Sequence, residues 1–327
     1  MSSGRLLRRL LAAVLLGIVV YAGFAFYRGV AEIGERLGRF SWIAFVAACA
    51  LAFGNYLLRY AKWEYYLWRL HVRGVPKLDS LLIYLSGFVL TVTPGKVGEV
   101  FRSFLLQKSH KVPIAKTAPI VVAERLTDVI GIVVLVLFGS TGFEGGLFWA
   151  GLGGALVVIA LFAIGSETVV NLAVRLVGML PGRLGALGPK LRESWEGLRL
   201  LTSPRALLVP TLLSIVAWWL EGVSLWVILH GFGEPVSLSL ACFFYSTATL
   251  AGALIPVPGG LGITEGALEE QLTRLGGVTT ATATSAMMLV RLATLWFAVL
   301  VGFLALAWWR ARHPEAEQRL AAPAEER

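Results

Sequence analysis

Several charged side chains stand inside apolar stretches of this chain, at positions that lipid-facing helices do not normally carry. An ionisable group inside a membrane costs at least about 2.5–3.5 kcal/mol, so such groups usually face a polar cavity or one another. Arginine offers a planar fork of donors that matches a phosphate, and lysine offers a compact charge. These residue types therefore predict an internal anion-binding site. They are Arg59, Lys62, Glu124, Arg125, Asp128, Glu221 and Arg291.

A proline-glycine break, TPGKVGEVFR at 93–102, interrupts another apolar stretch and carries more charge. A helix that stops inside a membrane leaves backbone groups that water cannot satisfy, so such breaks survive where they are buried in protein or line a polar cavity. Lys96 and Arg102 supply cations beside Glu99. The break predicts part of the same binding site.

A second break, IPVPGGLGITEGAL at 255–268, has the same character. We expect its prolines to end one half-helix, its glycines to form the turn with positive φ, its threonine to cap the next half-helix, and its glutamate to lie in the first turn. The positive end of that half-helix dipole would suit a phosphate or a carboxylate. The alternative is a tight turn that any re-entrant loop requires. The candidate residues are Gly259, Gly260, Gly262, Thr264 and Glu265.

Composition places these motifs in a membrane. The 327 residues are 57% hydrophobic and 15% charged, with a mean hydropathy of +0.75, which is too apolar for a soluble globule. Cys49 and Cys242 lie in separate apolar segments, so we expect no disulfide and no metal site. The net charge of +9 fits cytoplasmic loops beside anionic lipid better than a nucleic-acid partner.

The sequence predicts an all-α polytopic membrane protein with about six full spans and two re-entrant helical hairpins. The basic first segment resembles a signal peptide, but its apolar body is long and lacks a cleavage site, so we expect an uncleaved span. The hairpins are predicted at 79–104 and 238–273. The apolar stretch before the first break, 78–93, has 16 residues, which is short for a helix that crosses the membrane. The spans are predicted at 6–27, 41–66, 115–138, 147–165, 206–230 and 279–309.

Charge distribution favours hairpins over single crossings. If both broken segments return to the side they entered from, 17 basic residues face the cytoplasm and 4 face the other side. If each crossed once, the basic residues between 175 and 205 would lie outside, which the positive-inside tendency disfavours. Both termini are then cytoplasmic. We expect the location to be a bacterial-type cytoplasmic (inner) membrane.

The hairpins imply an inverted repeat, because the second half repeats the order span, span, hairpin, span with every direction reversed. The charged residues and the proline of each break have similar spacings in the two halves. Arg59, Pro94 and Arg125 are separated by 35 and 31 residues, and Glu221, Pro258 and Arg291 by 37 and 33. The predicted regions are a first membrane region 1–165, which includes the first span of the second repeat, a basic connector 166–205, the rest of the second repeat 206–309, and a disordered cytoplasmic tail 310–327.

Alternatives remain open for several features. The connector suits short amphipathic helices on the inner leaflet or an ordinary linker. Arg59 and Lys62 share a helix face, and the alternative to a cavity is that they snorkel to the interface. Glu124, Arg125 and Asp128 could instead form a structural ion-pair cluster. Glu221 and Arg291, the single charges in the fifth and sixth predicted spans, could pair with each other and only hold two helices together.

The combined motifs resemble the lysylphosphatidylglycerol synthase transmembrane-domain family over about 1–310. That resemblance implies an inner-membrane protein that moves a lipid, with the charges and hairpins lining the path. No soluble aminoacyl-transferase domain follows Arg312 in this sequence, so we expect no synthase activity. The motifs are Arg59-x-x-Lys62-Trp63, Pro94-Gly95-x-x-Gly98-Glu99-x-x-Arg102, Glu124-Arg125-x-x-Asp128, Pro256-Val257-Pro258-Gly259-Gly260-x-Gly262-x-Thr264-Glu265, and Arg291.

The function that these observations favour is translocation of a lipid without ATP. Phospholipid, aminoacylated lipid and polyprenyl-phosphate lipid all present a phosphate, and a homo-oligomer stays open. The sequence has no Walker loop, HExxH or GxSxG, so we expect no enzyme, no catalytic residue, no cofactor and no metal. The alternatives are an intramembrane lipid-modifying enzyme and an ion-coupled transporter of a small anionic solute. In the transporter, Asp128, Glu221 and Glu265 would bind protons or cations.

Overall fold

The computed structural model describes residues 15, 17, 19–24, 26, 29–92, 99–139, 146–179, 188–255 and 257–315. Every regular element within these ranges is a helix, which confirms the all-α prediction. Three helical stretches are long and apolar enough to cross a membrane. They are α3 (Trp42–Arg69), α11 (Pro204–Gly231) and the continuous run Thr280–Arg312. The chain is an all-helical, multi-pass membrane protein.

The continuous run joins α14 (Thr280–Arg291) to α15 (Phe297–Arg312) through a π-helical segment, η6 (Leu292–Trp296). The α8 helix (Gly146–Gly165) is followed after a 69° bend by α9 (Glu167–Gly178), and the pair could form a fourth span. The predicted 115–138 span is divided into α6 (Ile114–Thr117) and α7 (Pro119–Gly139). The predicted span at 6–27 lies largely outside the described residues.

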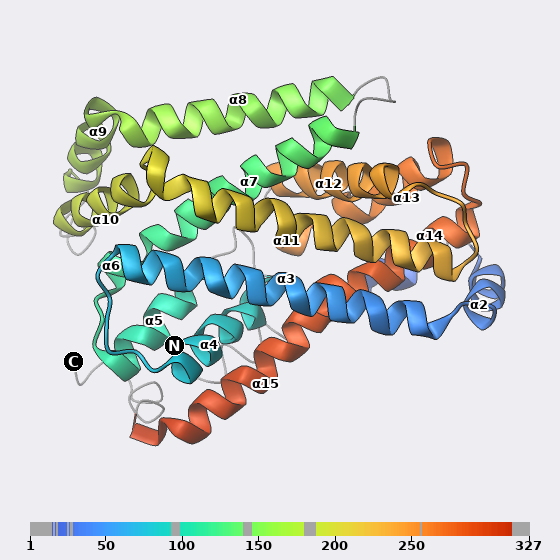
Figure 1. Cartoon of the computed structure of the whole chain (residues 1–327), viewed down its shortest axis with the longest axis horizontal. Helices are drawn as coiled ribbons and strands as arrows, with labels where there is room; N and C mark the ends of the chain where they lie inside the picture. The colour runs from blue at the N-terminus through green and yellow to red at the C-terminus, as the bar shows by residue number, and fades with distance from the viewer. Residues whose placement is uncertain are drawn as a thin grey trace.

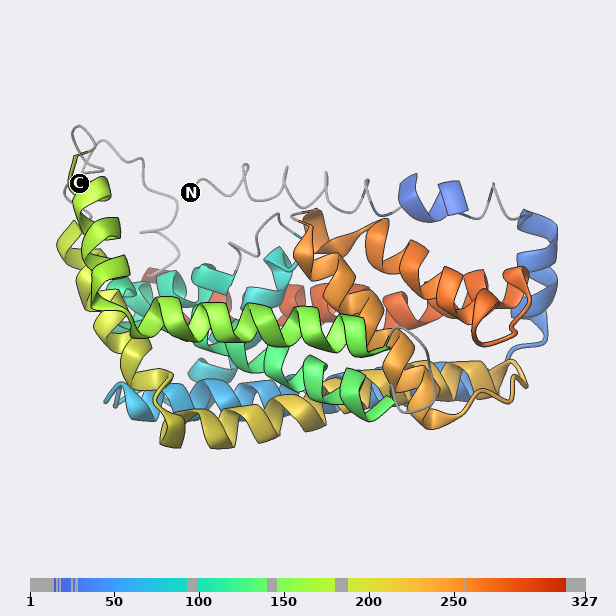
Figure 2. The same cartoon turned by 90° about the horizontal axis from the view of Figure 1, so that it is seen from above.

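The α3 and α11 helices run antiparallel along one side of the molecule in both views (Figures 1 and 2). Buried polar groups join them along their length: Asn55 Nδ2 donates to the Ala217 carbonyl at 2.7 Å and Ser224 Oγ to the Ala48 carbonyl at 3.3 Å. The short α2 helix (Val30–Gly38) lies at one end of the molecule (Figure 1). The α7 helix also packs on α11.

The first broken segment consists of α4 (Lys77–Ser86), η1 (Gly87–Leu90) and α5 (Val100–His110). Contacts on one carboxylate show where it begins and ends. Asp79, in the first turn of α4, lies 3.6 Å from Nε2 of His110 at the end of α5 and 3.1 Å from Nε of Arg312 at the end of α15. The segment therefore returns to the end of the molecule from which it started.

The second broken segment consists of α12 (Leu238–Leu254), η5 (Pro258–Gly260) and α13 (Ile263–Arg274). Thr247 Oγ1 donates to Gln271 Oε1 at 2.7 Å, and Gly252 lies against the side chain of Thr264 near the tip. The pairing moves apart in sequence with distance from the tip, so α12 and α13 are antiparallel. In Figure 2, α12 leaves the layer of α3 and α11 and crosses the molecule.

The two broken segments meet near the middle of the molecule. Val92, Leu261, Leu295 and Val299 form a small buried cluster, and a Cβ on Gly259 would lie 3.2 Å from Val92 Cγ1. There is no room at position 259 for a side chain larger than that of glycine. The turn of the second broken segment therefore lies in direct contact with Val92 of the first.

The first segment is also seated on α15. A Cβ at Gly302 would lie 2.7 Å from the Val89 nitrogen, so the glycine lets the two backbones touch. Position 302 is thus the point where the last span supports η1.

The predicted connector contains α9 and α10 (Gly188–Leu201), on either side of residues outside the described ranges. Trp195 Nε1 donates to the Ile164 carbonyl at 2.8 Å, which fixes α10 to the end of α8. The predicted tail boundary at 310 is wrong, because α15 continues to Arg312, which contacts Asp79. The rest of the predicted tail, 316–327, lies outside the described residues.

Candidate functional site

A cavity of about 120 Å³ lies where the broken segments meet α3, α7, α11 and α14. It is several times larger than the roughly 15 Å³ that one water needs. Three guanidinium groups reach its wall from three different helices: Arg59 from α3, Arg125 from α7 and Arg291 from α14. Two carboxylates, Glu99 and Glu221, also line it. The cavity is thus a charged chamber inside an apolar molecule.

Arg125 is paired with Glu99, the residue that precedes α5. Its Nε lies 3.0 Å from Glu99 Oε2, and its Nη2 contacts Oε1, so the guanidinium and carboxylate face each other as two forks. The Arg125 side chain is 28% exposed and that of Glu99 9%. Both residues line the cavity, and the Arg125 side chain is the more exposed of the two.

Arg291 is paired with Glu265 of the second broken segment in a similar way. Its Nε lies 2.7 Å from Glu265 Oε1, and its Nη2 donates to the Gly259 carbonyl at 2.8 Å. Glu265 is fully buried. Each broken segment therefore contributes one glutamate that holds one cavity arginine.

The predicted cap of the second half-helix is wrong. Gly262, with φ +86°, is the N-cap of α13, and its N–H donates to Glu265 Oε2 at 2.8 Å. Glu265 therefore takes the capping role expected of Thr264, and this N–H is not left for a substrate anion. Thr264 lines the cavity with Gly259 and Gly260, whose φ values of +61° and +68° confirm the expected glycine turn.

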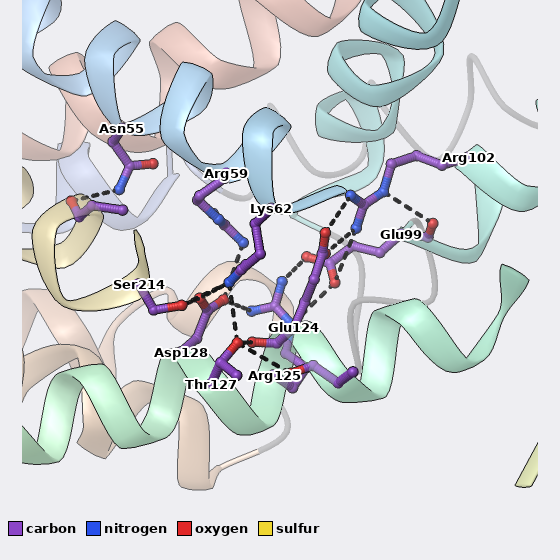
Figure 3. A network of polar contacts seen from close by, with 12 residues as sticks. Asn55, Arg59, Lys62, Glu99, Arg102, Glu124, Arg125, Thr127, Asp128 and Ser214 are labelled. Carbon is purple, nitrogen blue, oxygen red and sulfur yellow. Dashed lines mark hydrogen bonds and ion pairs between the residues drawn. The ribbon is translucent and has the colours of Figure 1, made fainter. Parts of the chain in front are cut away.

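Lys62 does not line the cavity and is buried completely. Figure 3 shows its polar contacts. Its Nζ donates to Asp128 Oδ1 at 2.6 Å, Ser214 Oγ at 2.8 Å and Thr127 Oγ1 at 3.3 Å. All three protons of the ammonium have acceptors, as a buried charge requires. The alternative in which Lys62 snorkels to the interface is wrong.

Arg59 shares the same carboxylate, with Nη2 at 3.2 Å from Asp128 Oδ2 (Figure 3). Its guanidinium carbon lies 6.0 Å from the Trp218 ring centre. Arg59 and Lys62 are three residues apart on α3 and reach one partner, as their shared helix face predicted. Only Arg59 of the two lines the cavity.

Arg102 and Glu124 form a second buried pair, at 3.2 and 2.7 Å between their two donor and acceptor atoms. The Arg102 guanidinium also lies 4.9 Å from the Tyr84 ring centre and 5.2 Å from that of Trp63. Arg102, Glu124 and Lys62 are not among the cavity-lining residues. Of the three residues for which a structural ion-pair cluster was the alternative, Glu124 fits that role.

Glu221 lines the cavity from α11 and accepts a hydrogen bond from the Tyr245 hydroxyl at 2.8 Å. The alternative in which Glu221 pairs with Arg291 is wrong, because Arg291 holds Glu265. Glu221 is a buried carboxylate whose described hydrogen bond is to a neutral group.

The structure adds cavity residues that the sequence did not indicate, among them Tyr56, Trp218 and Tyr245. Tyr56 donates to the Thr294 carbonyl at 2.7 Å, inside the π-helical segment that follows Arg291. Aromatic residues are common in spans, so none of these had a distinguishing pattern. A π segment has no simple sequence signature either, although it often lies at functional sites.

The two remaining sequence predictions concern Lys96 and the expected absence of a metal site. Lys96 lies outside the described residues. Within the described ranges no group of three or more histidine, cysteine, aspartate or glutamate side chains could hold a metal ion.

Comparison with known proteins identifies relatives in three organisms, each described as a UPF0104 membrane protein. The relative in Methanothermobacter thermautotrophicus is 22% identical over 320 residues, which cover 90% of this chain and 94% of the relative. The relative in Methanocaldococcus jannaschii is 24% identical over 66% of this chain and 91% of its own length. The one in Pyrococcus horikoshii is 26% identical over 67% and 73%.

The model of one family, described as the lysylphosphatidylglycerol synthase TM region, matches residues 10–302. This match covers both broken segments, all three cavity arginines and their carboxylate partners. The chain belongs to the lysylphosphatidylglycerol synthase transmembrane-region family.

Proposed function

We propose that this protein moves a phosphate-bearing lipid between the two leaflets of the membrane without ATP. The observation that carries the proposal is the convergence of Arg59, Arg125 and Arg291 on one internal cavity. Guanidinium groups in a place of low dielectric attract phosphate strongly, because little water competes. The family to which the chain belongs supports a lipid-related role.

The arginine partners suggest how binding would be coupled to movement. Arg125 holds a carboxylate with the same two-pronged geometry that would hold a phosphate. A phosphate that binds there competes with Glu99, and one that binds Arg291 competes with Glu265. Because each glutamate belongs to a broken segment, release of the carboxylate would free that segment to shift. Substrate binding and segment movement would thus share one set of ion pairs.

The proposal includes an inverted repeat with two re-entrant hairpins and cytoplasmic termini. The two broken segments are antiparallel helix pairs, and the first returns to the end where α15 finishes. Paired discontinuous helices around a central site are typical of alternating-access transporters. The protein would act on a phospholipid or a polyprenyl-phosphate lipid in the cytoplasmic membrane, with no catalytic residue and no cofactor.

One observation favours ion coupling as a second candidate. Glu221 lines the cavity, and its described hydrogen bond comes from Tyr245 rather than from a cation. A carboxylate in that setting can take up a proton when the cavity changes access. The protein would then couple transport of an anionic headgroup or solute to proton movement.

The central test is transport of a fluorescent anionic phospholipid in reconstituted vesicles. Arg125→Lys and Arg291→Lys keep the charge but lose the fork, so transport should fall by about tenfold or more, as loss of a charge-assisted hydrogen bond would produce. Arg274→Lys is the matched control, because Arg274 is 76% exposed on α13 and pairs only with Glu270 in the described contacts. Parent-like transport by both cavity variants would place phosphate recognition elsewhere.

Orientation has its own test in a protein whose two native cysteines, Cys49 and Cys242, are replaced by alanine. Lys108→Cys and Glu193→Cys should react with an impermeant thiol reagent only from the cytoplasmic side. Arg274→Cys should react only from the opposite side. Labelling of position 108 or 193 from outside would contradict the re-entrant arrangement.

A further inference from the structure

A second hollow of about 270 Å³ adjoins the central cavity and shares part of its wall. Arg125 and Trp218 face both spaces, and so do Gly252, Gly259 and Gly260 at the tip of the second broken segment. The glycines contribute no side chains to the partition between the two spaces. The two hollows are therefore neighbouring parts of one site.

The chemistry changes across this partition. The residues that line only the second hollow are mostly aliphatic, including Val129 and Ile132 on α7 and Leu254 and Ile255 at the end of α12. Leu254 is 40% exposed and Ile255 49% exposed, so the aliphatic wall continues to the surface of the molecule. Asp128 is the one carboxylate among the described residues that line this hollow, and Lys62 and Arg59 neutralise it.

The second hollow lies between α7 and the broken end of α12. At one end they are in close contact: a Cβ on Gly139 would lie 2.6 Å from Phe243 Cβ and 3.1 Å from the Ser239 carbonyl oxygen. At the other end α12 stops at Leu254, and the backbone becomes extended at Ile255, with φ −102° and ψ 126°. The hollow therefore has a side entrance at the break in α12, where Leu254 and Ile255 are exposed.

We infer that this entrance, between the middle of α7 and the broken end of α12, is a lateral portal that holds an acyl chain of the lipid. The inference rests on the proposed function, since the phosphate of the same lipid would lie in the adjoining central cavity, among Arg59, Arg125 and Arg291. Apolar walls suit an acyl chain, and cations beyond the partition suit its phosphate. A lipid could then present its headgroup to the cavity while its chain stays in hydrocarbon.

A donor at the junction fits the segment of lipid that connects phosphate to chain. Trp218 lines both hollows, and its buried Nε1 has no hydrogen-bond acceptor among the described residues. The Nε of Arg59, near the same indole ring, is also buried without an acceptor there. An unmade hydrogen bond from a buried donor is costly, and a lipid oxygen between phosphate and chain would supply an acceptor.

The first test needs no substitution. A phospholipid that carries a diazirine in one acyl chain is reconstituted with the full chain, irradiated, and its attachment sites are mapped by mass spectrometry. The portal predicts attachment to α7 around Val129 and to the end of α12 around Ile255. Attachment confined to the outer faces of other helices would overturn it.

The second test narrows the entrance. Val129→Trp and Ile255→Trp should lower transport of a long-chain fluorescent phospholipid by about fivefold or more, because a bulky ring fills the aliphatic hollow. Val134→Trp is the control: Val134 is on the same helix, is 39% exposed and does not line either hollow. Photolabelling at both sites should weaken in the narrowed variants and persist in the control.

The outcomes separate the portal from the proposed function. If the narrowed variants transport like the parent while Arg125→Lys and Arg291→Lys fail, the portal is wrong and lipid transport stands. If neither set of variants changes transport, both fail. Reduced transport in the narrowed variants, with the control unchanged, supports the portal.

Discussion

Arg291 and Glu265 are joined at 2.7 Å, and the 26 residues that separate them in sequence equal the separation of Arg125 from Glu99. In each half of the chain the glutamate stands at the start of the returning half-helix and the arginine on the next long helix. Equal intervals with equal chemistry are what a duplicated unit would leave. This relationship supports the proposed inverted repeat more directly than the proline landmarks do.

The Glu265–Arg291 pair gives the first prediction. Glu265→Gln keeps an acceptor for the Gly262 N–H but removes the charge that holds Arg291. We expect the variant to fold and to transport the fluorescent phospholipid at a different rate, slower by about tenfold if the glutamate must return to reset the site. Vesicle assays across a range of pH measure it. An unchanged rate and pH profile would leave Glu265 with a capping role alone.

The buried Lys62–Asp128 pair gives a stability prediction. Asp128→Asn leaves a fully buried ammonium without its carboxylate, and we expect a loss of about 3–5 kcal/mol in unfolding free energy. Lys62→Met in the same chain removes the uncompensated charge, so the double variant should recover part of the loss. Thermal unfolding in detergent compares the three proteins. A double variant less stable than Asp128→Asn would show that another contact dominates.

Gly302 gives a packing prediction, because a side chain there would meet the Val89 nitrogen at 2.7 Å. Gly302→Ala should destabilise the protein by about 1–3 kcal/mol through overpacking, despite the better helix propensity of alanine. Gly154→Ala on α8 is the control, since a Cβ there meets nothing within 4 Å. Equal melting temperatures for the two variants would mean that η1 can move away from α15 freely.

His110 gives a pH prediction at the polar end of the molecule. Its burial lowers its pKa, nearby His313 lowers it further, and Asp79 opposes the shift. The unfolded chain therefore takes up the proton at a higher pH than the folded one. The stability that follows is present above the ordinary pKa of about 6.5 and is lost as the pH falls through the lower folded value.

The measurement compares melting temperatures at about pH 7.5 and 5.5, on either side of the ordinary histidine pKa. His110→Gln should lose less stability on acidification than the parent. His230→Gln, at an exposed position on α11, should behave like the parent. A steeper acid loss in His110→Gln would contradict the sign of the shift.

Sequence patterns predicted three long apolar stretches, α3, α11 and Thr280–Arg312, because hydropathy and length nearly suffice for a helix in lipid. They were less informative at the breaks. Glycine and proline marked the second turn, but they did not show that Glu265, rather than Thr264, would cap α13. The cap is a local bond in which the third helical residue, Glu265, reaches back to the N–H of Gly262, while its other oxygen faces Arg291, 26 residues away.

The candidate site shows the same limit. Glu124, Arg125 and Asp128 were grouped as one cluster, yet Glu124 pairs with Arg102 away from the cavity, while Arg125 lines the cavity and lies 3.8 Å from Asp128. Glu124 and Arg125 are neighbours on α7 and point about 100° apart, so the sequence allowed this division, whereas Arg125 and Asp128 are three residues apart and share a face. It could not say which direction faced polar space, because that depends on Lys62 and Arg102 from other helices.

The π-helical segment Leu292–Trp296 sets the rotational phase of the last span. A π turn holds one more residue than an α turn, and one residue corresponds to about 100° of rotation about the helix axis. Arg291 before it faces the cavity, and Gly302 after it faces the first broken segment. Deletion of one residue within the segment would turn α15 relative to α14. Gly302 could then no longer face η1 while Arg291 faces the cavity.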